Sequence, residues 1–448
     1  MTLSLIIAKD WQVFQGTDTQ SYIKPAISLI ESGKFLTNGF PDTFRTPGYS
    51  LFLLLGLGLG SVDFITIFLQ IIASCWTVYL IYKISLIIFN ENEKIAILSA
   101  LLYALEPLSI VLSLKIMPET LFTSLLITFL YYFIQYLVND NYNQKLFDLI
   151  KSAILLSATI YVKPITYYLP LLILIFIIIL IIKKKHQTKI LVLHSLIFLI
   201  IAMTPVYLWQ LRNQIQTGYA GISSVKEVNL YYWHGSAILT ATEKIEYRES
   251  WNKLEEKISQ DLTSEEMKNQ KKLYQHIKKE AIQLIREHPW TYLYLRLNGT
   301  LNVLFNSSPL AYISLFKIEV GSSVSNFDAC TTVFYQKGFL AFIIVYFQKM
   351  QRVVILTWIG LQIILFIYLA LACRGFISSK RPNNLLMIFT LSLAVYLLII
   401  AGGPEGLITR YRHPIMPIIC ILAGLGLNLT IEEFQKIRYN NQEFQKSD

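Results

Sequence analysis

Long apolar runs constrain this chain more than any other feature of its sequence. A helix that crosses the hydrocarbon core of a bilayer needs about 20 mostly apolar residues. We predict a membrane-spanning helix for each of nine apolar runs in the 448 residues: 64–89, 95–112, 119–138, 148–163, 165–182, 189–209, 352–373, 384–402 and 413–430. The sequence therefore predicts an all-α polytopic membrane protein.

The composition agrees with this prediction. Only 15% of the residues are charged, whereas soluble domains average about a quarter. The four cysteines are scattered and form no CxxC pair, so we expect no disulfide framework. The six histidines form no HExxH motif. We therefore expect no required cofactor and no structural metal, while a divalent cation bound by carboxylates stays open.

Basic residues predict the orientation of the chain. Lys and Arg outnumber Asp and Glu by 39 to 29, and nucleic acid is one partner that such a surplus could bind. However, the basic clusters 183–185 and 374–381 directly follow apolar runs, which is typical of short cytoplasmic loops. We therefore expect a membrane protein without a nucleic-acid partner. By alternation, the loops 1–46, 210–351 and 403–412 lie on the outer side.

Five regions follow from this topology. They are a first extracytoplasmic loop with membrane-associated helices (1–62), an N-terminal transmembrane module (63–209), a largely helical extracytoplasmic segment with interfacial helices (210–351), C-terminal transmembrane helices (352–430) and a cytoplasmic tail (431–448). Within 210–351, which we call the outer segment, the capping box at 263–266 predicts one charged helix through about His288. We expect 210–290, the part of this segment with soluble composition, to be a lid or spacer rather than a catalytic domain.

Ionisable residues gather at the predicted outer ends of the spans. Such residues are costly at membrane depth and by default mark function. They are Asp18, Arg45, Lys115, Glu119, Lys163, Arg212, Arg410, Arg412 and His413. An acid surrounded by cations at a membrane face suits a reaction on an anionic lipid, with the acid as base and the cations stabilising a phosphate.

Each of these residues also has a simpler interpretation. The arginines could extend to lipid headgroups, and an isolated Asp such as Asp18 is usually a turn residue or a helix cap. Lys115 and Lys163 could pair with Glu119 or Glu106 as buried structural ions. From the residues alone, the prediction is that something anionic binds on the outer face.

Six stretches, in this order, resemble a known family. They are "GTDTQSYIKPAISLIESGKF", "FRTPGYSLFLLLGLGLG", "LEPLSIVLSLKIMPETLFTSLL", "YVKPITYYLP", "YLWQLRNQIQTGY" and "TRYRHPIMPIICILAGLGL". Together they resemble the GT-C superfamily of membrane glycosyltransferases that use polyprenyl-phosphate sugars, in the branch of the protein O-mannosyltransferases and the bacterial aminoarabinose transferase. The resemblance covers nearly the whole chain apart from 240–350.

The resemblance implies a GT-C-type helical bundle with 63–209 as its catalytic module. It also implies an inverting transfer from a polyprenyl-phosphate monosaccharide to a lipid, glycan or protein acceptor, on the extracytoplasmic face of a bacterial plasma (inner) membrane. Asp18 corresponds to the base that takes the proton of the acceptor hydroxyl. The residues expected to bind the donor phosphate are Arg45, Lys163, Arg212, Arg410 and Arg412. Those expected to bind or orient substrate are Tyr22, Lys115, Glu119 and His413, and Glu119 could instead help to bind a metal.

Two departures from the family pattern lead to further expectations. Relatives begin with a full transmembrane helix, whereas only "MTLSLIIA" precedes Lys9 here. We therefore expect either a start codon further upstream or a fold that has lost its first span. The acidic motif is Asp-Thr rather than the Asp-Glu of the mannosyltransferases, so protein mannosylation is not carried over.

Three other functions are also found among polytopic membrane proteins with charged outer loops. A transporter or flippase for a lipid-linked glycan would place its ionisable residues near the midplane and often shows internal repeats. Here the charges gather at one face and no repeat is evident. A polysaccharide polymerase or ligase would concentrate its chemistry in one large late loop, which the early position of Asp18 disfavours. An inactive scaffold stays open, and the sequence specifies neither sugar nor acceptor.

Overall fold

The computed structural model describes residues 11–183, 188–307, 309–316, 323–378, 384–404 and 408–447. Over these residues the chain is almost entirely helical, which confirms the predicted all-α class. One small hairpin interrupts the helices, in which β1 (Leu36–Thr37) pairs antiparallel with β2 (Phe40–Pro41). Asn38 and Gly39 form its two-residue turn with φ of 51° and 83°, a left-handed conformation that Asn-Gly pairs adopt readily.

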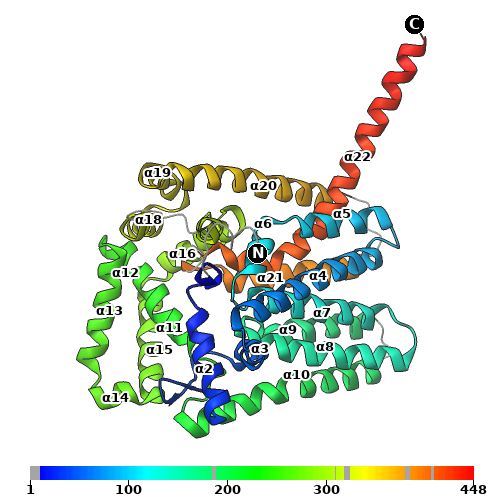
Figure 1. Ribbon diagram of the computed structural model, residues 1–448. Helices are drawn as coiled ribbons and strands as arrows, with labels where there is room; N and C mark the ends of the chain where they lie inside the picture. The colour runs from blue at the N-terminus through cyan, green and yellow to red at the C-terminus, as the bar shows by residue number, and fades with distance from the viewer. Residues whose placement is uncertain are drawn as a thin grey trace.

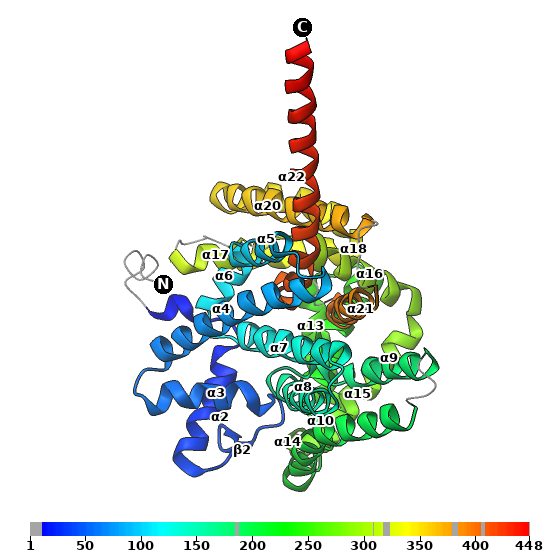
Figure 2. The same cartoon turned by 90° about the vertical axis from the view of Figure 1, so that its right-hand side faces the viewer.

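Six helices are long and apolar enough to cross a membrane, counting only the described residues. They are α4 (Val62–Ile88), α7 (Glu119–Val138), α10 (Thr188–Thr217), α20 (Arg352–Ile377), α21 (Asn384–Ala401) and the span Thr409–Gln442, which joins η7 (Thr409–Ile415) to α22 (Met416–Ser447). Several of these helices run side by side in Figure 1, and α22 continues beyond the body as a projecting helix (Figures 1 and 2). The predicted polytopic bundle is therefore confirmed.

Three of the nine predicted spans differ from the expectation. The run 95–112 is bent by 52° between α5 (Glu93–Ala104) and α6 (Pro107–Leu114). The bend follows from Glu106-Pro107, because the Glu106 carboxylate accepts the Ser109 backbone N–H at 2.6 Å and starts a new helix with proline in its first turn.

The other two are the runs 148–163 and 165–182, neither of which forms a helix that meets the same test of length and composition. The helix at the first, α8 (Tyr142–Val162), carries three charges in its first half, at Lys145, Asp148 and Lys151. The helix at the second, α9 (Leu169–Lys183), has 15 residues and follows a short 3-10 turn, η2 (Pro164–Thr166). Both helices still pack in the bundle. Helix α8 contacts α7 and α10, and helix α9 contacts α10.

Small residues allow the C-terminal spans to approach closely. A Cβ atom on Gly426 of α22 would lie 1.9 Å from the Leu371 carbonyl oxygen of α20, so only glycine fits at this crossing. Close backbone approach through small residues is a common way for membrane helices to associate. Within the region 1–62, where membrane-associated helices were predicted, the apolar helix α3 (Pro47–Gly58) packs on α2 (Thr19–Ser32), α4 and α8.

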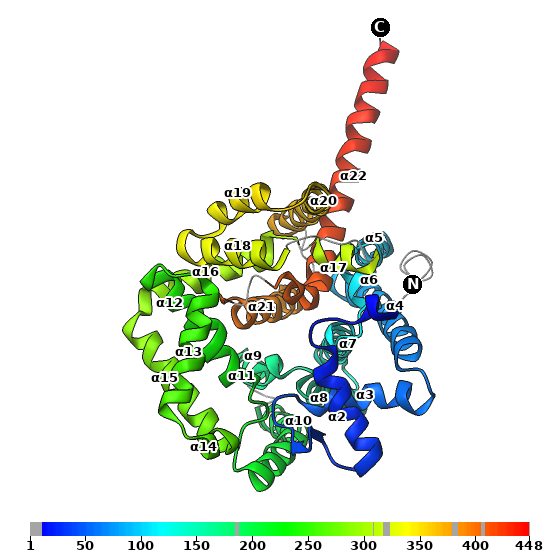
Figure 3. The same ribbon diagram turned by 60° about the vertical axis from the view of Figure 1, so that its left-hand side comes forward.

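The outer segment folds as an arc of helices beside the bundle (Figure 3). Its elements are α11 (Val225–Val228), the π-helix η4 (Asn229–Gly235), α12 (Ser236–Glu243), α13 (Tyr247–Asp261), α14 (Ser264–Lys268), α15 (Gln270–Glu287), α16 (Pro289–Phe305), α17 (Leu310–Ile313), η5 (Ser314–Phe316), α18 (Ser323–Lys337) and α19 (Phe339–Lys349). Two apolar clusters form its interior, one around Phe334 and Tyr335 and the other around Tyr231 and Ile277.

The predicted capping box is present, but the single helix predicted after it is wrong. Thr263 accepts the Glu266 backbone N–H and Glu266 accepts the Thr263 backbone N–H, as expected. However, α14 ends at Lys268, because the Asn269 side chain accepts the Lys272 backbone N–H and begins the separate helix α15. Gln270 thereby becomes the first residue of α15.

Candidate active site

A cavity of about 500 Å³ lies between the membrane helices and the outer segment. Six of the ten residues predicted for the site line it: Asp18, Tyr22, Arg45, Glu119, Lys163 and Arg410. These residues come from α2, the loop before α3, the start of α7, the end of α8 and η7. The fold therefore brings one acid from the beginning of the chain and one cation from its end to the same wall.

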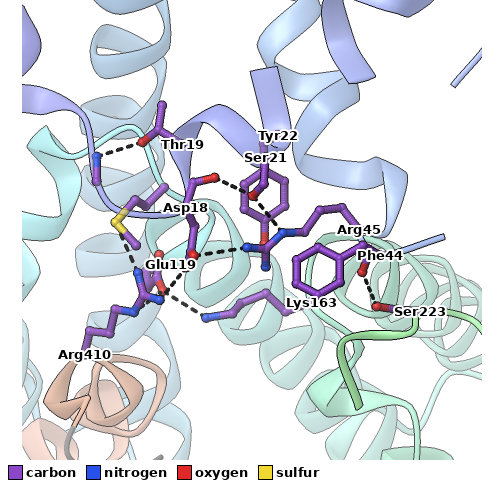
Figure 4. Close-up of polar contacts among 12 residues, drawn as sticks. Asp18, Thr19, Ser21, Tyr22, Phe44, Arg45, Glu119, Lys163, Ser223 and Arg410 are labelled. Atoms are coloured by element: carbon purple, nitrogen blue, oxygen red, sulfur yellow. Dashed lines mark hydrogen bonds and ion pairs between the residues drawn. The ribbon is translucent and has the colours of Figure 1, made fainter. Parts of the chain in front are cut away.

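Asp18 is the N-cap residue of α2, yet its side chain makes no capping hydrogen bond. Its carboxylate instead binds two guanidinium groups, with Oδ1 3.1 Å from Arg45 NH2 and Oδ2 2.5 Å from Arg410 NH2 (Figure 4). The neighbouring Thr19 holds the start of α2 in place, because its hydroxyl donates to the Ile116 carbonyl at 2.7 Å. Asp18 is thus directed at cations rather than at its own helix.

Arg45 is oriented by side chains of α2. Its Nε donates to Ser21 Oγ at 2.9 Å and its NH1 donates to the Tyr22 hydroxyl at 3.2 Å. The guanidinium carbon also lies 4.5 Å from the centre of the Tyr22 ring, within the range of a cation–π contact. Tyr22 therefore acts on the site through Arg45.

Glu119 and Lys163 reach the cavity for local reasons. Glu119 is the first residue of α7 after Pro118, where the helix dipole favours a negative charge. Lys163 ends α8 in an extended conformation, as expected for a residue that precedes proline. The Lys163 amine lies 3.0 Å from Glu119 Oε1, and Arg410 Nε lies 3.5 Å from the same oxygen. Two interpretations of Lys163 were given above, binding of the donor phosphate and pairing with a carboxylate as a buried structural ion. The ion pair with Glu119 is the second of these.

The cations control the protonation of Asp18. Burial acts to raise the pKa of the Asp18 carboxyl, but attraction by Arg410 and Arg45 outweighs it and holds that pKa below its usual 3.8. Burial raises the pKa of the Tyr22 phenol to about 12, against the opposing effect of Arg45. At neutral pH, Asp18 is therefore ionised and Tyr22 is a neutral hydrogen-bonding group.

Arg212 and Arg412 were predicted to bind phosphate, and the structure places both outside the lining of the cavity. Arg212 donates to the backbone carbonyls of Phe35 and Asp42, each at 2.7 Å. Arg412 is 3% exposed and donates from NH1 to the carbonyl of Asn306, just after α16. Both arginines bind backbone carbonyls that other segments supply, so neither extends to lipid headgroups.

Lys115 and His413 also lie outside the cavity lining. The Lys115 amine donates to the Val13 carbonyl at 2.5 Å and to Ser314 Oγ at 2.9 Å, and burial lowers its pKa to about 8. A ring nitrogen of His413 lies 2.9 Å from the Thr123 hydroxyl. Among the described residues, Lys115 forms no hydrogen bond or ion pair with Glu119, so the predicted pairing of these two residues is not found.

The outer segment contributes cavity residues that the sequence analysis did not identify. Six of them that carry polar side chains are Lys226, Glu227, Asn229, His234, Tyr292 and Arg296. Glu227 accepts the Tyr219 hydroxyl at 2.8 Å, and Lys226 donates to the Tyr168 hydroxyl at 3.2 Å. None of the six lies in the stretches that resemble the family, so no motif indicated them. The segment expected to be only a lid or spacer supplies part of the cavity wall.

One group of side chains has the donor set for a metal ion, among the residues that the structure describes. Asp261, His276 and Glu280 place three ligand atoms within 4.8 Å of one another on α13 and α15. Lys257 already pairs with Glu280 there. None of these residues lines the cavity, so we assign the group no part in its chemistry.

Comparison with known proteins supports the resemblance seen in the sequence. Residues 45–209 match the model of a family described as dolichyl-phosphate-mannose-protein mannosyltransferase. The match confirms the resemblance to polyprenyl-phosphate-dependent membrane glycosyltransferases over the stretch that holds Arg45, Glu119 and Lys163. Asp18 and Arg410 lie outside it, and the fold brings them to the same cavity.

Solved structures show a more distant likeness. The chain is similar to ArnT from Cupriavidus metallidurans in the apo state, with a TM-score of 0.39, and bound to undecaprenyl phosphate, with a TM-score of 0.40. Both comparisons show 12% sequence identity and cover 95% of this chain and 76% of the other. A comparison with curated proteins finds no match.

Proposed function

We propose that this chain, whose residues 45–209 match a family of polyprenyl-phosphate-dependent glycosyltransferases, transfers a monosaccharide from a polyprenyl phosphate to an extracytoplasmic acceptor. The observation that carries the proposal is the Asp18 carboxylate, held between Arg45 and Arg410 on the wall of a cavity of about 500 Å³. The sugar and the acceptor, whether lipid, glycan or protein, are left open.

The charge of the cluster suits such a donor. Three cations (Arg45, Lys163 and Arg410) and two carboxylates (Asp18 and Glu119) leave a net charge of +1, as 3 − 2. A polyprenyl-phosphate sugar is a phosphodiester with one negative charge, and further charge develops on the phosphate as the sugar leaves. Fixed cations stabilise that developing charge most strongly where water is excluded.

Asp18 is the candidate base. In the proposed reaction its carboxylate takes the proton of the acceptor hydroxyl, whose oxygen forms a bond to the anomeric carbon. The bond from that carbon to the phosphate oxygen breaks, and its electron pair stays on the polyprenyl phosphate. Attack from the face opposite the phosphate inverts the configuration of the sugar.

The two arginines explain how Asp18 is held before donor binds. Their attraction keeps the carboxylate ionised but also makes it a weak base, since it lowers the pKa. A donor phosphate would compete for the same guanidinium groups. That competition would weaken their hold on Asp18 and increase its basicity when substrate is present.

The test is donor turnover by the purified protein in lipid, with a panel of polyprenyl-phosphate monosaccharides. Release of polyprenyl phosphate would be followed for the wild type, for Asp18→Asn and for Asp140→Asn, a control at an exposed position. Loss of a general base lowers rates by about 10²–10⁴-fold, so we expect this fall in Asp18→Asn with donor binding retained. Binding without turnover in the wild type and in Asp18→Asn would favour transport, a missing acceptor or an inactive scaffold, and the absence of binding would contradict the proposed role of the cations.

A further inference from the structure

The loop that carries Arg45 is anchored by the outer segment. Residues 41–45 run from the last residue of β2 toward α3, and Arg45 extends from their end to Asp18. The Asp42 carboxylate organises the loop from within, because its Oδ1 accepts the backbone N–H groups of Phe44 at 2.7 Å and of Arg45 at 3.0 Å. Such a turn is local and does not by itself fix the loop against the rest of the protein.

Gln270 supplies a contact from far along the chain. Its Nε2 donates to the Pro41 carbonyl at 2.9 Å, and its Oε1 accepts the Thr43 hydroxyl at 2.5 Å. These partners are 229 and 227 residues away in sequence. The two bonds use both ends of one amide group and hold the loop on either side of Asp42.

We propose that Gln270 is a positioning residue that, together with Arg212, Ser223 and Ser224, which also contact this loop, fixes the loop 41–45, and with it the Arg45 guanidinium, at the wall of the cavity. The outer segment would then do more than cover the site. Gln270, the first residue of α15, would determine the position of Arg45, which faces Asp18. The phosphate-binding part of this inference rests on the proposed function, whereas the anchoring of the loop does not.

The amide of Gln270 allows a substitution that removes only one of its two hydrogen bonds. Gln270→Glu has nearly the same shape and still accepts from Thr43, but it places an oxygen against the Pro41 carbonyl, which is an acceptor only. Gln270→Ala removes both bonds. Gln283→Ala is the matched control, because Gln283 is on the same helix and its side chain bonds Glu287 in an exposed contact.

The first measurement needs no substrate. Hydrogen–deuterium exchange of the backbone amides of Phe44 and Arg45 should accelerate about 5- to 30-fold in Gln270→Ala, as expected for two lost hydrogen bonds. Gln270→Glu should show an increase as well, and Gln283→Ala none. Exchange that stays at the wild-type rate in Gln270→Ala would overturn the proposal.

The second measurement separates positioning from general stability. Binding of polyprenyl phosphate from phosphatidylcholine vesicles would be compared for Gln270→Ala in the wild-type and the Arg45→Ala backgrounds. We expect weaker binding in the first background and no further loss in the second, because the effect passes through Arg45. An equal loss in both backgrounds would overturn the positioning role. Faster exchange in Gln270→Ala, combined with a wild type that binds no polyprenyl phosphate, would support the anchor and contradict the proposed function.

Discussion

Asp18 and Arg410 are 392 residues apart in sequence, and their side chains meet in a hydrogen bond of 2.5 Å. Together with Arg45, Arg410 holds the pKa of Asp18 below its usual value despite burial, which acts in the opposite direction. The pair joins the first loop of the chain to the turn before its last span. Its chemical consequences are open to direct tests.

The pH dependence of activity should shift when Arg410 is removed. In the wild type, Asp18 stays ionised above its lowered pKa, so the acid limb of kcat/KM that reports Asp18 lies below pH 3.8. In Arg410→Gln, burial remains while the largest attraction is lost, so this limb should move to higher pH. Arg374→Gln, which removes an arginine paired with Glu433 outside the cavity, should leave the limb in place.

The stability of the protein should respond to the same ion pair with a definite sign. A carboxyl whose folded-state pKa is lowered stabilises the fold above its unfolded pKa, near 3.9, and this stabilisation is lost as the pH falls through the lower folded value. Acid unfolding of the wild type should therefore include a contribution below about pH 4. Asp18→Asn should lack that contribution, and an unchanged acid limb of stability in this variant would contradict the assignment.

Glu119→Gln should destabilise the protein strongly. Glu119 is 1% exposed and lies against both Lys163 and Arg410, so its neutralisation leaves two cations facing each other in a poorly hydrated site. Removal of one member of a buried ion pair costs about 3–5 kcal/mol. Chemical denaturation in a mild detergent would measure the loss. Glu256→Gln, at an exposed position of α13, should change the free energy of unfolding little.

Arg412→Lys should lower stability but leave phosphate binding unchanged. Arg412 donates from one nitrogen to the carbonyls of Val303 and Asn306, and a lysine cannot reproduce the planar guanidinium geometry. Hydrogen bonds to charged groups contribute about 1.5–3 kcal/mol, so the melting temperature should fall. If the affinity for polyprenyl phosphate falls while the melting temperature does not, Arg412 binds phosphate as the family resemblance implied.

Cysteine labelling should define which side of the membrane holds the cavity. In a background without the four native cysteines, a cysteine at Asp18 or Glu256 should react with an impermeant reagent from outside. A cysteine at Lys184, which lies outside the described residues, should react only from the cytoplasm. The reverse pattern would separate the proposed base from an extracytoplasmic acceptor and contradict the mechanism.

Much of this molecule could be predicted from its sequence because membrane helices are encoded locally. Long apolar runs predicted the helical bundle, and basic residues after two of those runs predicted an orientation that labelling can test. The capping box at Thr263 and Glu266 was also visible, since its partners are three residues apart. The mispredicted helix boundaries also had local causes. They are the break at Glu106-Pro107, the charges in the first half of α8 and the cap at Asn269. Each depends on a single hydrogen bond or on a few charges, which a search for apolar runs does not detect.

The membership of the site was decided only by tertiary structure. Arg410 and Arg412 are two residues apart and have the same chemistry, yet one faces Asp18 and the other donates to the carbonyl of Asn306. The turn η7 sends their side chains to different surroundings, and no local pattern specifies that choice. Likewise, the amide of Gln270 acquires its role only because α15 brings it to Pro41, 229 residues away in sequence. The sequence determined which charges lie at the ends of the apolar runs, whereas long-range packing determined which of them meet.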